Sequence, residues 1–174
     1  MLDTRELGRR PGSQREVAFE VPAPADLGIE VLAVPEGSPV VLDLRLEAVM
    51  EGVLVTGSAR AGLVGECVRC LEPISDEVEA RFQELFVYGD VDRDAGDDDV
   101  QRLEGDLLDL EPELRDAVVL ALPFQPLCRE DCPGLCAECG ARLADDPEHR
   151  HEAPIDPRWA GLAALQQDDP DSTA

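Results

Sequence analysis

The sequence predicts an α+β protein, built mainly from an antiparallel β-sheet with one packed helix and a metal-clamped C-terminal segment. Three runs between residues 41 and 88 alternate apolar and polar side chains with a period of two, which indicates half-buried strands. One later run repeats its apolar side chains every three or four residues, as on one face of a helix. Around and beyond these runs lie paired cysteines and histidines at spacings typical of metal ligands.

The strands are expected in chain order. Residues 17–21 form the first and residues 41–48 the second. A turn at 50–52 leads into residues 53–63, so these two alternating runs make a long hairpin. A third alternating run covers 74–88. Small residues in the second arm of the hairpin predict close packing by something large, or a bulge: Gly57, Ala59 and Ala61.

A loop and a helix follow the strands. Residues 89–100 hold six aspartates. Counted from Asp90, the sixth and twelfth positions hold Ala95 and Gln101 where an EF-hand needs glycine and glutamate, so a disordered acidic loop is expected. Glu111 and Pro112 suit the start of a helix, and Pro123 ends it. One face of this helix should be buried across the sheet: Leu114, Ala117, Val118, Ala121 and Leu122.

Three regions follow from this order of elements. Residues 1–127 are expected to form the β-rich core with its packed helix. Residues 128–165 form a Cys/His-rich zinc-knuckle segment with a short C-terminal helix that begins at Asp156 and Pro157. Residues 166–174 form a disordered tail.

The charge of the chain narrows the choice of partners. Its 174 residues carry a formal net charge of −24, and every basic residue is arginine. Nucleic-acid affinity depends on basic side chains that displace phosphate counterions, so general RNA or DNA binding is disfavoured and a protein partner is favoured. The sequence contains neither a secretory signal nor an apolar run of membrane-spanning length. A cytoplasmic location, where thiols stay reduced, is expected.

One basic patch interrupts the acidic chain: Arg5, Arg9, Arg10 and Arg15. Exposed charge runs are usually solvated faces, so the favoured interpretation is that these arginines pair with the protein's own carboxylates. The alternative is a local contact with RNA or another anion.

Metal ligation is the main chemical signal of the sequence. All six cysteines and both histidines fall into four close pairs: Cys67 and Cys70, Cys128 and Cys132, Cys136 and Cys139, His149 and His151. Such spacings bring two donor atoms to one point, and four donors make a tetrahedral zinc site. One or two structural Zn²⁺ ions are therefore expected, with iron as an alternative for an all-sulfur site.

Two partitions of these ligands are open. In the first, one site uses Cys67, Cys70, Cys128 and Cys132, and the other uses Cys136, Cys139, His149 and His151. In the second, a single site uses Cys67 and Cys70 with Cys136 and Cys139, or the four clustered cysteines alone.

A structural metal is favoured over a catalytic one. Four protein ligands leave no open coordination position, and the sequence has no nucleophile elbow, no phosphate-cradling glycine loop and no third histidine as a base. A non-enzymatic protein without a small-molecule substrate is expected. The alternative is a thiol redox protein or redox-sensing zinc switch that uses Cys67 and Cys70. Glu66 and Glu72 argue against a reactive thiol there, and Arg69 argues weakly for it.

Five motifs occur in order along nearly the whole chain: LGRRPGS at 7–13, GECVRCLEP at 65–73, Leu122-Pro123 leading to Leu127-Cys128, DCPGLCAECG at 131–140 and DPRW at 156–159. This series resembles the bacterial YceD family, known as large ribosomal RNA subunit accumulation proteins. Many members carry C-x-C where this chain has His149 and His151, a swap that a ligand role permits. The resemblance implies a role in the synthesis, processing or stability of 23S ribosomal RNA, without established enzymatic chemistry.

The expected function is thus a non-enzymatic factor in large ribosomal subunit assembly. Its negative charge favours action through a ribosome-assembly protein or a basic ribosomal protein, with RNA contact only indirect or local. A generic zinc-ribbon adaptor with a different partner is the further alternative.

Overall fold

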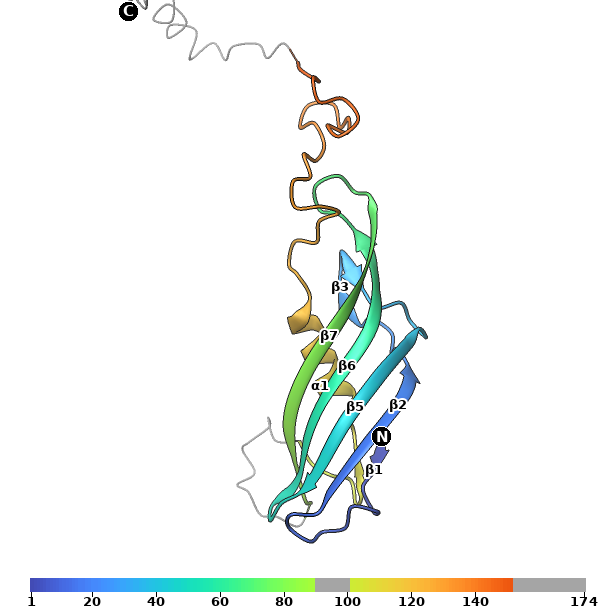
Figure 1. Ribbon diagram of the computed structural model, residues 1–174, viewed down its shortest axis with the longest axis vertical. Coiled ribbons are helices and arrows are strands. Elements are labelled where there is room, and N and C mark those ends of the chain that lie inside the picture. Colours follow the sequence, from blue (N-terminus) through green and yellow to red (C-terminus); the bar gives the residue numbers. More distant parts are fainter. Residues whose placement is uncertain (90–100, 152–174) are drawn as a thin grey trace, which may run out of the picture. The chain divides into compact units, whose positions relative to one another are not determined.

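Four long strands form the antiparallel sheet that the alternating runs predict. They are β2 (Gln14–Pro22), β5 (Pro39–Ala48), β6 (Gly52–Glu66) and β7 (Pro73–Val87). The strands pair in the order β2–β5–β6–β7, and each pair is antiparallel. The short strands β3 (Gly28–Ile29) and β4 (Leu32–Ala33) extend the sheet beside the far end of β6 (Figure 1). The predicted mainly antiparallel sheet with one helix is confirmed.

Small residues in β6 make room for large side chains from both neighbouring strands. Gly57 is paired with Leu44 on β5 and with Phe82 on β7. A Cβ atom at position 57 would lie 2.5 Å from Cδ2 of Leu44 and 2.8 Å from Cζ of Phe82. These contacts confirm the close packing predicted from the small residues and explain why a glycine stands in the middle of a long strand.

The helix α1 (Glu111–Ala121) covers the buried face of the sheet and packs against β7 and β3 (Figure 1). Its first turn contains Pro112 and two acidic residues, which suit the positive end of the helix dipole. Leu114 and Val118 are buried as predicted. The expectation that Ala121 shares the buried face is wrong, because Ala121 is exposed at the end of the helix. Leu122, at the extended residue that follows, is buried as predicted.

A two-stranded ribbon adds to the same core. Strand β1 (Leu2–Asp3) pairs with β8 (Leu107–Leu108), and Leu108 is fully buried. The hydroxyl and backbone N–H of Thr4 both donate to the carbonyl oxygen of Asp106. Sequence patterns gave no sign of this ribbon, since a two-residue strand has no periodicity to detect.

The computed structural model describes residues 1–89 and 101–151. The chain divides into two units, Met1–Cys132 with the sheet and α1, and Pro133–Ala174, of which residues 133–151 are described. The expected acidic loop, apart from Gly89, lies outside the described residues, and so do the C-terminal helix and tail expected at 156–174. Among the described residues, no helix has the length and hydropathy that crossing a membrane requires.

Candidate metal centres

The first cysteine pair lies in the loop that joins β6 to β7. The last strand pair of this hairpin is Glu66 with Pro73, so Cys67 and Cys70 stand directly at its end. The backbone N–H of Cys67 donates to the carbonyl oxygen of Glu72 at 2.8 Å, and that of Leu71 donates back to the carbonyl oxygen of Cys67 at 2.8 Å. This tight turn directs both thiols to the same side of the loop.

Residues that follow α1 bring the second pair to the same place. The N–H of Val68 donates to the carbonyl oxygen of Pro126 at 3.0 Å, and Nη1 of Arg69 donates to the carbonyl oxygen of Cys132 at 3.0 Å. These two bonds fasten the segment after the helix to the hairpin loop. The sequence interpretation assigned no such anchoring role to Arg69.

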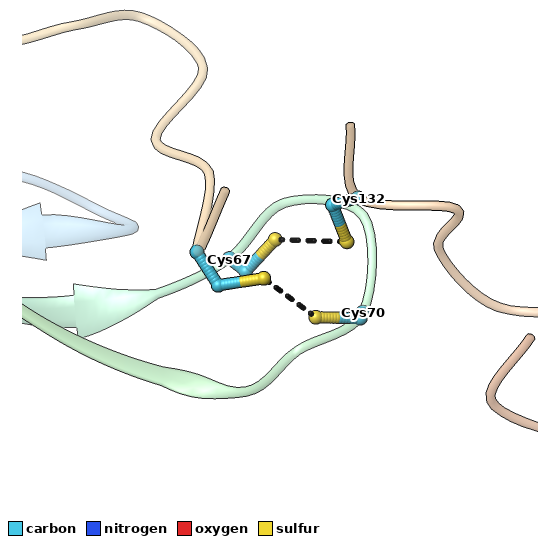
Figure 2. A group of neighbouring side chains, drawn as sticks. Cys67, Cys70 and Cys132 are labelled. Atoms are coloured by element: carbon cyan, nitrogen blue, oxygen red, sulfur yellow. Dashed lines mark hydrogen bonds between the residues drawn. The ribbon is translucent and has the colours of Figure 1, made fainter. Parts of the chain in front are cut away.

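The four thiols meet as one cluster, which we call the four-cysteine group: Cys67, Cys70, Cys128 and Cys132. Their sulfur atoms all lie within 4.8 Å of one another. The sulfur of Cys67 is 3.8 Å from that of Cys132, and the sulfur of Cys70 is 3.6 Å from that of Cys128. Figure 2 shows Cys67 and Cys70 on the hairpin loop with Cys132 facing them from the other segment.

The thiols of this group differ in pKa. Burial raises the pKa of Cys67, but the backbone N–H groups of Cys128, Arg69 and Cys70 outweigh burial and lower it to about 6. At Cys128 shielding of the sulfur from water raises the pKa, and the neighbouring thiols raise it further, to about 12. The Cys67 thiolate thus forms readily, whereas the Cys128 thiol keeps its proton unless a nearby positive charge, such as a bound cation, favours its thiolate.

A second cluster lies within the unit that begins at Pro133, and we call it the Cys2His2 group: Cys136, Cys139, His149 and His151. Nε2 of His149 and Nε2 of His151 are 3.2 Å and 3.3 Å from the sulfur of Cys139, and 2.8 Å from each other. The backbone N–H groups of Cys139 and Glu138 lower the pKa of the Cys136 thiol. The donor atoms of all four residues lie within 4.8 Å of one another.

A carboxylate lies close to the Nδ1 atom of each histidine of this group. Nδ1 of His149 is 3.7 Å from Oδ2 of Asp146, and Nδ1 of His151 is 3.5 Å from Oε2 of Glu138. Metal-bound histidines commonly direct the second ring nitrogen to a carboxylate, which fixes the ring and makes the ligating nitrogen more basic. Sequence reasoning did not assign Asp146 or Glu138. An acid three residues before His149 was the available signal for Asp146, and no short spacing links Glu138 to its partner.

Both groups have donor atoms and spacing that suit a tetrahedral metal ion. Around a metal with bonds of about 2.3 Å to sulfur, tetrahedral geometry sets sulfur atoms about 3.8 Å apart, close to the two distances measured in the four-cysteine group. In the Cys2His2 group the two imidazole nitrogens, at 2.8 Å, are closer than the roughly 3.3 Å of such a tetrahedron. The structure can therefore hold metal ions at two places, with the ligands grouped as in the two-site partition.

The two C-x-x-C turns share one backbone geometry but differ at the residue after the second cysteine. Gly140 follows Cys139 with φ = 72°, and its N–H donates to the carbonyl oxygen of Cys136 at 2.8 Å. Leu71 follows Cys70 with φ = 59° and donates in the same way to Cys67. A left-handed conformation costs a residue with a side chain about 1–2 kcal/mol, so Leu71 is strained where glycine would not be.

The basic patch near the N-terminus is largely paired within the protein. Arg5 binds the carboxylate of Asp3, which lowers the pKa of that carboxyl to about 2. Arg15 lies 2.6 Å from a carboxylate oxygen of Glu6. Arg9 lies 3.8 Å from Asp106 and stacks over the ring of Tyr88, and Arg10 is exposed. This pairing follows the interpretation favoured from the sequence for Arg5, Arg9 and Arg15.

Comparison with known proteins places both groups within a matched family region. The family model described as "Large ribosomal RNA subunit accumulation protein YceD" matches residues 55–166. An uncharacterized protein of Mycobacterium tuberculosis is 49% identical over 166 residues, covering 94% of this chain and 80% of the relative. The protein YlbN of Bacillus subtilis is 31% identical over 107 residues, covering 61% and 62%. No solved structure matches the chain.

Proposed function

Because this chain belongs to the YceD family of large ribosomal RNA subunit accumulation proteins, we propose that it is a non-enzymatic factor in large ribosomal subunit assembly. The observation that carries the proposal is the family match over residues 55–166. This stretch contains all eight residues of the two candidate metal groups. In this proposal the chain acts in the synthesis, processing or stability of 23S ribosomal RNA.

Zinc is the metal that we propose for both groups. Two cysteines with two histidines, and four cysteines alone, are both common ligand sets of structural zinc. Four protein donors in each group fill a tetrahedron and leave no position for a substrate or an activated water. The proposed role of the metal is therefore to hold loops in place, and its binding energy adds to folding energy.

A protein rather than RNA is the proposed direct partner. The net charge of −24 repels phosphate backbones, and three of the four arginines in the N-terminal patch already face carboxylates. A ribosome-assembly protein or a basic ribosomal protein is attracted by the same charge. Because ribosomal components assemble in the cytoplasm, we propose that the protein acts there.

The redox alternative has one observation in its favour, the pKa of about 6 at Cys67. A reactive thiolate must also be accessible, and Cys67 is fully buried beside three other thiols. A lowered pKa suits a metal ligand equally well, since metals bind the thiolate form. Rapid and selective alkylation of Cys67 in the metal-loaded protein would favour the redox function over the assembly function.

The decisive experiment measures the ratio of large-subunit to small-subunit ribosomal RNA in cells depleted of this protein. Depletion should selectively lower the large-subunit species, and the wild-type gene should restore it. Alleles with Cys67→Ser and Cys132→Ser, or with Cys136→Ser and Cys139→Ser, test whether each group is needed. An unchanged ratio after depletion would refute the proposed function.

A further inference from the structure

Leu71 combines two properties that stability alone does not explain. Its backbone is in the left-handed region, at φ = 59°, where the matching turn of the Cys2His2 group has Gly140. Its side chain is 59% exposed, so little burial compensates the strain. Strained residues that persist in a fold are concentrated at functional sites, where the side chain is needed for contact.

Other apolar side chains of the same unit are also exposed. Phe124 is 90% exposed and Leu120 82% exposed, where the chain leaves α1. Val68, on the hairpin loop with Leu71, is 39% exposed. The hydrogen bond from the N–H of Val68 to the carbonyl oxygen of Pro126 joins the loop to the segment that carries Phe124. Val68 and Phe124 thus lie on two segments that are bonded to each other, and exposed apolar side chains on adjoining segments mark interaction surfaces more often than singly scattered ones.

Carboxylates lie close in sequence to these apolar side chains. Glu66 and Glu72 flank the hairpin loop, and Glu130 and Asp131 follow Cys128. Asp116 stands one helical turn before Leu120, on the same side of α1. The two nearby arginines are engaged, Arg69 with the carbonyl oxygen of Cys132 and Arg129 with the carboxylate of Asp131. The surroundings are thus acidic, and an apolar segment flanked by Lys or Arg complements them.

We propose that Leu71, Val68, Phe124 and Leu120 form a docking surface, held in shape by the four-cysteine group, for an apolar segment of a basic large-subunit ribosomal protein. The identity of the partner class rests on the proposed function, whereas the surface itself rests on strain, exposure and charge. The four-cysteine group takes two thiols from the loop that carries Leu71 and two from the segment that follows Phe124. A metal bound there would hold the two parts of the surface together in addition to the hydrogen bonds of Val68 and Arg69.

A photo-cross-linking experiment tests the surface directly. The full chain, metal-loaded, carries p-benzoylphenylalanine in place of Phe124, and the probe is the total protein extracted from purified large ribosomal subunits. The matched control carries the same group in place of Met50, an 85% exposed residue in the turn between β5 and β6. A cross-link from position 124, and not from position 50, to a basic subunit protein is expected. A cross-link only to a second copy or to the chain itself, or none from position 124, would overturn the proposal.

The substitution Leu71→Gly separates docking from folding. Glycine relieves the positive φ, so the melting temperature and metal content should be unchanged or higher. The yield of the cross-link from position 124 should fall about tenfold, as expected when a side chain at the centre of an interface is removed. An unchanged yield in this variant would show that Leu71 has no part in docking.

A complementation test with a double variant distinguishes failure of this inference from failure of the proposed function. In depleted cells, the double variant Leu71→Gly and Phe124→Ser should not restore the large-subunit RNA, whereas Met50→Ser should. Full restoration by the double variant would refute the docking surface and leave the assembly function standing. If depletion itself has no effect on the RNA ratio, the assembly function fails, and a cross-link from position 124 to a subunit protein would still support the surface.

Discussion

Cys67 and Cys132 lie 65 positions apart in the chain, and their sulfur atoms lie 3.8 Å apart in the structure. One is at the end of the β6–β7 hairpin, and the other follows α1 in the segment that the helix delivers. A metal at this point closes a loop that contains β7 and α1, so it orders the chain well beyond its four ligands.

We expect two metal ions per chain, one for each group. The substitution Cys132→Ser should leave one ion, Cys139→Ser should also leave one, and the double variant should leave none, because a tetrahedral site with three protein ligands binds far more weakly. Native mass spectrometry of the purified proteins gives these counts. Two ions retained by Cys132→Ser would contradict the four-cysteine group as a site.

The two metals should differ in how fast they are released. Cys67 is 0% exposed and Cys132 only 3%, whereas Cys139 and His151 are exposed. A chelator such as 4-(2-pyridylazo)resorcinol therefore reaches the Cys2His2 group first, and we expect two phases of metal release. In Cys139→Ser only the slow phase should be present, and in Cys132→Ser only the fast one. Equal rates at the two sites would argue against the difference in burial.

Adding one methyl group at two glycines of β6 should have opposite effects. In Gly57→Ala the new Cβ meets Leu44 at 2.5 Å and Phe82 at 2.8 Å, and such overpacking costs about 1–3 kcal/mol. In Gly62→Ala the new Cβ meets nothing within 4 Å. This matched control should raise the free energy of unfolding by about 0.4–1 kcal/mol, since the unfolded chain loses freedom. Denaturant unfolding of both variants measures the difference.

Glu113 should make stability depend on pH in an unusual direction. Burial raises the pKa of this carboxyl, and the nearby Glu84 and Asp116 raise it further. Folding makes the charged form of such an acid less favourable. The charged carboxylate therefore lowers the free energy of unfolding at pH values above the folded pKa, and this loss of stability disappears as the pH falls below the unfolded value of 4.5. Glu113→Gln should therefore raise the melting temperature at pH 7, with the gain lost near about pH 3. A lower melting temperature at pH 7 would contradict this assignment.

The N-terminal arginines should not provide RNA affinity. Arg5, Arg9 and Arg15 each face a carboxylate, so phosphate contact would require breaking these pairs. Replacing the three with glutamine should leave the binding of a 23S RNA fragment, and its dependence on salt, unchanged in a filter-binding assay. A smaller salt dependence after replacement would show that the patch contacts phosphates.

Much of the fold could be predicted from the sequence because periodicity reports local burial. The alternation of Leu42, Leu44 and Leu46 predicted β5, and the helical spacing of Leu114 and Val118 predicted α1. The ribbon of β1 and β8 could not be predicted, since two paired residues carry no period. The exposure of Ala121 was missed because the helix ends there and the chain turns, a change that a periodic pattern does not register.

The sequence by itself determined which residues are candidate metal ligands, since eight thiols and imidazoles fall into pairs whose spacing brings two donors together. It left open how the pairs combine, because ligands far apart in the chain share a site only when the backbone brings them together. Tertiary structure decided this by placing the segment after α1 against the β6–β7 loop, through the bonds of Val68 and Arg69. It also revealed the strain at Leu71, since a backbone angle follows from the turn that the folded loop imposes, and no composition or spacing reports it.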